Sequence, residues 1–193
     1  MAAGWVACVP AGAWVLNVSA GTRAVYLAVG NARANADNTA INRVSLNLPA
    51  TQVGSGNPQV MNTADSATST QAQSPADGYT VCTPASGQVY VGGFFRLPAA
   101  SASVAVLQVS TPAALTNGAF SIPFSQISWT STALGNTTAH IPAGTFPSGG
   151  TLFLRNFSAN TFVENCHTFS YANTTPVADG TYTGRATYTL TAP

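Results

Sequence analysis

The 193-residue sequence contains no lysine and little charge of either sign. Charged residues make up 6% of the chain, whereas roughly 25% is usual in globular proteins. Six scattered arginines and five acidic residues give a formal net charge of +1. The absence of a basic patch argues against nucleic-acid binding and against electrostatic docking on a membrane. Solubility must rest on Ser, Thr, Asn and Gln, which suits an extracellular protein or one that packs against copies of itself.

Long apolar segments are also missing. No run of about 20 apolar residues is present, so we expect no membrane insertion. The first 18 residues are apolar but contain no basic residue and are interrupted by Pro10 and Gly12, unlike a signal peptide. We interpret the chain as a mature secreted protein of the cell surface, with Met1 as an expression start.

Few residues are available for catalysis. The sequence matches no nucleophile-elbow, zinc-protease, phosphate-loop or dinucleotide-binding pattern. Its only histidines are His140 and His167. Cys166 and His167 are adjacent in an expected strand and should point to opposite faces, which excludes a nucleophile–base pair, while Glu164 shares the Cys166 side. We expect no enzyme activity, no catalytic residue, no metal site and no cofactor.

The three cysteines, Cys8, Cys82 and Cys166, are far apart and form no CxxC pair. This spacing excludes zinc-finger and thioredoxin-like motifs. In an oxidising compartment any two of them could pair, and three buried thiols are the alternative. We predict a Cys8–Cys82 disulfide that leaves Cys166 as a buried thiol.

Helical periodicity is absent, and two-residue alternation takes its place. Alternating segments recur about every 10–20 residues between Gly, Pro and Asn turns. The pattern predicts an all-β fold, an antiparallel immunoglobulin-like or jelly-roll-like β-sandwich of roughly ten strands. We expect a single domain over residues 1–193, with two small β-domains meeting near residues 98–119 as the alternative.

The clearest strand lies at the C-terminus, over residues 181–191. Threonines and Arg185 occupy one side of it, and the other side, the candidate closing strand face, consists of Tyr182, Gly184, Ala186, Tyr188 and Leu190. Successive side chains of a strand point to opposite faces, so we expect one buried and one solvated face.

Other segments follow the same alternation less regularly. Gly92-Gly93 predicts a bulge or a sharp bend, and Pro123 allows only an edge strand or a broken strand. Residues 51–78 are interpreted as a long polar loop, and a domain junction or a short edge strand at 59–62 are the alternatives. The remaining expected strands are 14–18, 25–29, 43–48, 79–83, 88–97, 104–109, 120–129, 152–155 and 161–171.

Three segments carry a family resemblance: residues 122–129 (IPFSQISW), 141–146 (IPAGTF) and 176–190 (PVADGTYTGRATYTL). Together they resemble the C-terminal part of bacterial pilin-like and spore-coat-U-like surface proteins of the chaperone–usher class. The resemblance implies an incomplete immunoglobulin-like sandwich that a neighbouring copy completes with one strand. It also implies a periplasmic chaperone and an usher as partners, besides copies of the chain itself.

We therefore predict a structural subunit of an extracellular bacterial fibre or pilus that assembles by β-strand addition. The candidate donor strands are two alternating segments, with an internal hairpin of the two as the alternative: Trp14, Leu16 and Val18, and Val25, Leu27 and Val29.

A monomeric surface adhesin or carbohydrate-binding module is the second hypothesis, and a capsid or tail-decoration protein is the third. In the second, the 51–78 loop and exposed aromatic side chains would bind the sugar, the candidates being Trp5, Tyr79, Tyr90, Trp129 and Tyr171.

Overall fold

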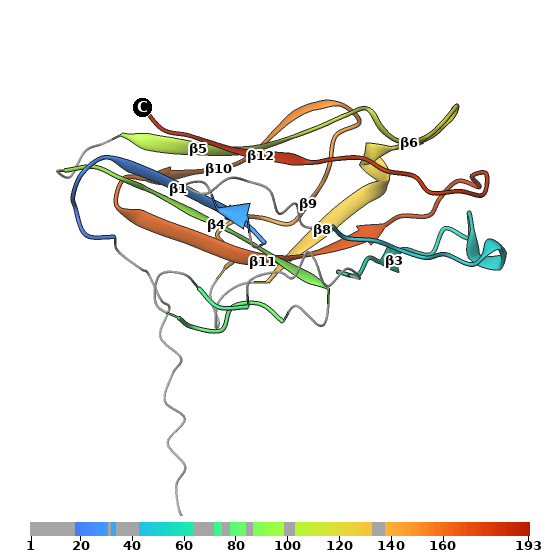
Figure 1. Cartoon of the computed structure of the whole chain (residues 1–193), viewed down its shortest axis with the longest axis horizontal. Helices are drawn as coiled ribbons and strands as arrows, with labels where there is room; N and C mark the ends of the chain where they lie inside the picture. Colours follow the sequence, from blue (N-terminus) through green and yellow to red (C-terminus); the bar gives the residue numbers. More distant parts are fainter. Residues whose placement is uncertain are drawn as a thin grey trace, which may run out of the picture.

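The computed structural model describes residues 18–30, 32–33, 43–63, 72–74, 78–83, 87–98, 103–132 and 138–193. These residues form β-strands in two stacked antiparallel layers, with two short 3₁₀ turns, η1 (Ala50–Gln52) and η4 (Phe124–Gln126) (Figure 1). The predicted all-β sandwich is confirmed.

The larger sheet has the order β2-β1-β4-β11-β8-β9, and β3 pairs with Ser170 and Tyr171 at the C-terminal end of β11. Its two longest strands, β4 and β11, lie in the middle of the sheet, and each pairs with a strand on either side. The bounds are β1 Ala24–Val29, β2 Ala32–Arg33, β3 Gln59–Val60, β4 Gln88–Arg96, β8 Ile127–Thr132, β9 Gly144–Thr145 and β11 Thr161–Tyr171.

The smaller sheet has the order β10-β5-β12, and a separate hairpin, β6-β7, continues from β5. Pro123 ends β7 before η4 and β8, so the predicted break in this segment is confirmed. The bounds are β5 Val104–Thr111, β6 Ala114–Asn117, β7 Phe120–Pro123, β10 Gly150–Ser158 and β12 Thr187–Thr191.

The hydrophobic core fills the space between the two sheets. Leu107 and Val109 of β5 face Val91 and Val163 of the larger sheet, and all four are at most 1% exposed. At one end of the core the Trp129 and Phe146 rings lie 4.7 Å apart. Inward-facing residues alternate with outward-facing ones along each strand, as sheet packing requires.

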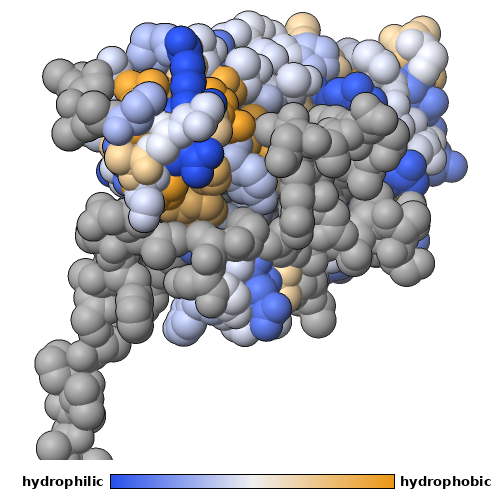
Figure 2. All heavy atoms as spheres, turned by 60° about the vertical axis from the view of Figure 1, so that its left-hand side comes forward, coloured by the Kyte–Doolittle hydropathy of each residue, from blue (hydrophilic) through white to orange (hydrophobic). Residues whose placement is uncertain are grey.

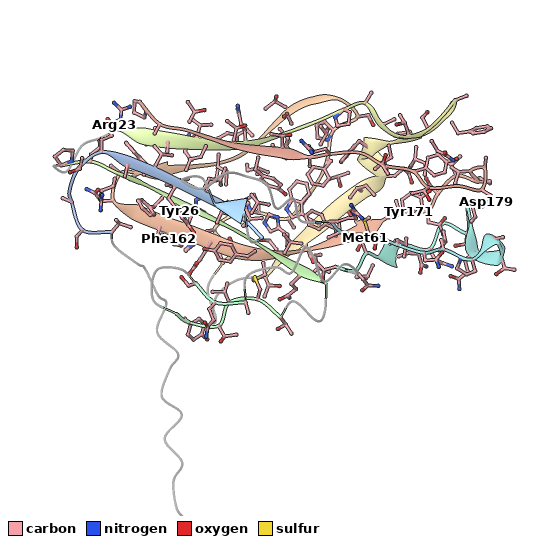
Figure 3. The ribbon with its side chains drawn as sticks, viewed as in Figure 1. Arg23, Tyr26, Met61, Phe162, Tyr171 and Asp179 are labelled. Atoms are coloured by element: carbon pink, nitrogen blue, oxygen red, sulfur yellow. A yellow bond between two sulfur atoms is a disulfide. The ribbon has the colours of Figure 1, made fainter. Side chains whose placement is uncertain are left out.

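The outer face of the larger sheet carries a row of aromatic side chains across three strands. Tyr26, Phe94 and Phe162 are direct cross-strand neighbours, and adjacent ring centroids are 5.4 Å and 5.9 Å apart. Figure 3 shows Tyr26 and Phe162 on the side of the sheet turned away from the smaller sheet. Such cross-strand aromatic pairs stabilise the register.

The Gly92-Gly93 pair does not form the predicted bulge, because β4 keeps a regular register with both neighbours. A Cβ at Gly92 would collide with the Tyr90 hydroxyl, and one at Gly93 would lie 2.6 Å from the backbone oxygen of Tyr26. Gly92 thus leaves room for the Tyr90 side chain, whose hydroxyl donates a hydrogen bond to Glu164 Oε2 at 2.6 Å.

A disulfide fixes the segment around residue 82 to this outer face. It joins Cys82 to Cys166, with Cα atoms 5.5 Å apart, so the predicted Cys8–Cys82 pairing and the free Cys166 thiol are wrong. Cys166 lies on the outer face of β11, two residues after Glu164, where the chain around Cys82 passes over it. Sequence separation gave no sign of this proximity, because 84 residues lie between the two.

A β-bulge does occur, in β10 at Leu154. The register to β5 shifts between Phe153 and Arg155, so that Arg155 lies opposite the buried Leu107. The bulge thus turns Arg155 toward the interior, where one of its terminal nitrogens donates to the backbone oxygen of His140. Burial and the Arg155 charge lower the pKa of His140.

The polar 51–78 region is anchored by one buried asparagine. The Asn173 side chain accepts from the Gly54 backbone nitrogen at 2.8 Å and donates to Gln52 and Ser55. Val60 of β3 pairs with β11, which confirms the predicted edge strand. Of the segments 43–48 and 79–83, also predicted as strands, only isolated bridges at Ser45 and Thr80 form.

Candidate functional site

The C-terminal segment has the predicted two-sided character, but of the strand predicted over 181–191 only Thr187–Thr191 forms a strand, β12. From Thr181 to Thr191, Tyr182, Ala186, Tyr188 and Leu190 are half-buried, and the threonines and Arg185 between them are exposed; Gly184 is the exception, exposed on the inner side. The segment bridges to Thr116 at Thr183 and then pairs with β5 as β12. It therefore runs along one edge of the smaller sheet (Figure 1).

The second edge of β12 has no neighbouring strand among the residues that the structure describes. An edge strand leaves a row of backbone N–H and C=O groups unpaired on that side. The strand of the other layer that lies nearest to β12 is β1 (Figure 1). The two sheets thus approach each other at one border along β1 and β12, and we call this border the seam.

Core-facing side chains at the seam stay partly exposed. Val25 is 40% exposed although it lies opposite the fully buried Phe95, and Leu27, Val29, Tyr188 and Leu190 are only half-buried. Inward residues of the central β5 are at most 1% exposed from Ala105 to Val109. Figure 2 shows hydrophobic residues gathered on the side of the molecule that lies at the left of Figure 1. The core is incompletely covered at the seam.

Leu190 connects the two sides of the seam. A Cβ on Gly93 would lie 3.3 Å from a Leu190 methyl group, so Leu190 reaches across the core to β4, directly beside β1. Burying these methyl groups is favourable, and their remaining exposure leaves free energy to be gained from a further covering strand.

A buried polar group lies behind β12. His167 is fully buried, stacks on Trp129 at 5.9 Å and has its ring centroid 6.5 Å from that of Tyr188. Neither His167 nitrogen nor the Tyr188 hydroxyl has a hydrogen-bond partner. Burial raises the pKa of the Tyr188 hydroxyl and lowers the pKa of His167 to about 3. Both groups are therefore neutral at physiological pH.

We expect acid to destabilise the fold through His167. Its pKa falls from 6.5 in the unfolded chain to about 3 in the folded one, so only the unfolded chain binds this proton between those values. The contribution of the neutral His167 to the free energy of unfolding is fully present above pH 6.5 and is lost as the pH falls, by about 3 kcal/mol at pH 4. Urea unfolding at pH 8 and pH 4 measures this loss of stability. His167→Phe should lack this component, and an equal pH dependence in both proteins would contradict the assignment.

The candidate donor residues fall in two places. Val25, Leu27 and Val29 lie in β1, which pairs with β4 of the same chain. Trp14 and Leu16 lie outside the described residues, and the backbone nitrogen of Val18 donates to the Asn160 oxygen at 2.9 Å. In the described part of the chain β1 pairs with β2 and β4, and the structure does not test the predicted hairpin with 14–18.

The residues considered for catalysis are separated as predicted. Cys166 is in the disulfide on the outer face, whereas His167 lies in the core between the sheets. Glu164 shares the Cys166 side and accepts from Tyr90. Over the described ranges, no group of three His, Cys, Asp or Glu residues could hold a metal ion.

Most of the aromatic residues considered for sugar binding are buried. Trp129, Tyr90 and Tyr171 are at most 7% exposed, Tyr79 is 52% exposed, and Trp5 lies outside the described residues. Sequence reasoning missed Phe153 and Phe120, both 57% exposed. Two-residue alternation could have found Phe153, because it lies between the inward-facing Leu152 and Leu154 and therefore points to the other side of β10.

Comparison with family models, with curated proteins and with solved structures finds no match to this chain. In the part of the chain that the structure describes, no helix has the length and hydrophobicity needed to cross a membrane.

Proposed function

We propose that the protein is a structural subunit of an extracellular bacterial fibre that assembles by β-strand addition at the seam. The observation that carries the proposal is the coincidence of two features at one border. In the described part of the chain, the edge of β12 that has no neighbouring strand lies beside core residues that remain partly exposed, such as Val25. A strand inserted there would pair with β12 and cover these side chains at once.

The energetics favour such an addition. Each large apolar side chain that an incoming strand buries fully contributes about 1.5–3 kcal/mol. Three alternating apolar side chains would add to the backbone hydrogen bonds along β12. This combination is the usual source of affinity in strand addition, with side-chain pockets providing specificity.

Residues 14–18 of a neighbouring copy are the donor that we propose. They alternate Trp14, Leu16 and Val18 with smaller or polar residues, as a strand with one inserted face requires. The second candidate, 25–29, is occupied as β1 in its own sheet. The buried disulfide is compatible with secretion. A periplasmic chaperone and an usher as partners rest on the family resemblance.

The test is the assembly state of the purified full chain. We expect multimers that resist heat and denaturant, seen by size-exclusion chromatography with light scattering and as filaments by electron microscopy. Deleting residues 1–17 should leave folded monomers, because every described strand lies after residue 17. Cys8→Ala in the full chain is the control, since the deletion also removes that thiol. A full chain that stays monomeric at high concentration would contradict the proposal.

A further inference from the structure

The outer face of the smaller sheet carries no charge, and a bulge is the reason. In β10, Thr151 and Phe153 point outward, and regular alternation would place Arg155 beside them. The bulge at Leu154 turns Arg155 inward and brings Asn156 to the outer side instead. Arg185 is the charged residue nearest to β12 in the sequence, and it lies before the first residue of that strand, Thr187. We call this outer surface of β10, β5 and β12 the neutral face.

The neutral face presents one exposed aromatic ring among hydroxyl and amide groups. Phe153 is 57% exposed, and the strand register places Gln108 and then Thr189 in the same row across the sheet. The adjacent row begins with Asn156 and ends with Thr191. These side chains supply both donors and acceptors.

We infer that the neutral face binds an uncharged polysaccharide chain. A pyranose ring has an apolar face that can lie on the Phe153 ring and equatorial hydroxyls that can bond with Gln108 and Thr189. An uncharged surface complements an uncharged polymer and avoids the desolvation cost that a charged group would add. The Phe153 ring offers a flat apolar surface, and the amide and hydroxyl groups in its row can donate and accept hydrogen bonds.

A second copy of the chain fits this face less well. Sheets that pack face to face interdigitate apolar side chains, whereas the apolar members here are Phe153, Val104 and Val106 among hydroxyl and amide residues. The face points away from the core, since Leu107 and Val109 on the other side of β5 face the core. A polysaccharide on the outer face would use side chains of β10 and β5 that take no part in strand pairing at the seam, so the inference does not require strand addition.

The test is isothermal titration calorimetry of the full chain with dextran, xylan, galactomannan or laminarin. We expect at least one of these neutral polysaccharides to bind the protein, and Phe153→Ala to weaken the affinity about tenfold, as the loss of an aromatic contact and its burial implies. Phe120→Ala is the matched control, because Phe120 is equally exposed but lies on the β6-β7 hairpin. About 0.5 M NaCl should leave the affinity unchanged, since no charge takes part.

Three results would overturn the inference. The first is that none of the four polysaccharides binds the chain. The second is that Phe153→Ala and Phe120→Ala have the same effect. The third is that Phe153→Ala changes the multimer size in light scattering, which would assign the face to a second copy. Loss of the fibre proposal alone would leave polysaccharide binding intact, so the two failures are distinguishable.

Discussion

Replacing Val25 with Asp should abolish assembly and leave a folded monomer. Val25 is an inner residue of β1 at the seam, and its 40% exposure means that a carboxylate there can stay hydrated while no strand is added. An incoming strand would bury that carboxylate without a partner, which costs several kcal/mol. We expect the multimer population to disappear in light scattering, while the far-ultraviolet circular dichroism keeps its β-sheet form.

Val104→Asp is the matched control for this prediction. Val104 is similarly exposed, at 45%, but lies on the outer side of β5 and away from the seam. The same charge placed there should leave the multimers in place. Equal loss of assembly in both variants would indicate a general effect of charge, and unchanged assembly in Val25→Asp would remove the seam from the mechanism.

The second large effect concerns the disulfide. Converting both Cys82 and Cys166 to Ala should lower the free energy of unfolding by about 4 kcal/mol, because the bond closes a long loop of the unfolded chain. The sequence separation of the two cysteines is 84 residues. The packing around them adds to the loss, since both side chains are at most 1% exposed beside Tyr90 and Ala28.

Guanidinium unfolding with linear extrapolation measures this change. Cys8→Ala should unfold like the parent, which also separates the two disulfide hypotheses. A Cys8–Cys82 link found by peptide mapping under non-reducing conditions would contradict the structure on this point. A variant with both Cys82 and Cys166 replaced by Ala that is as stable as the parent would also contradict the structure.

Local sequence pattern predicted the position of several strands, both where one face meets water, as in β12, and where both faces are largely buried, as in β11. β11 and β5 begin where the sequence predicted them, and the half-buried side chains of the C-terminal strand are those that the pattern selected. These strands combine β-branched or aromatic residues with clear turn signals, so local sequence and tertiary packing agree. The segment 43–48 alternates equally well but forms only an isolated bridge from Ser45 to Asn62.

Tertiary contacts decided what the sequence left open. The Cys82–Cys166 pair depends on which loop crosses the outer face of β11. Gly92 suggested a bulge in the sequence, but its small size is needed to make room for the Tyr90 side chain. The bulge that does form, at Leu154, contains no glycine that could have predicted it. The seam is likewise invisible in sequence, because Val25 and Val109 look equally suited to a core and only packing shows that one of them stays exposed.

The central claim is that the seam accepts a strand, and amide hydrogen exchange tests it most directly. A synthetic peptide of residues 11–20 would be added to the chain lacking residues 1–17, beside a peptide carrying Asp at the positions of Trp14 and Leu16. The account predicts slower exchange of the β12 amides, Thr187 to Thr191, with the first peptide and no change with the second. Unaltered exchange along β12 with both peptides would contradict it.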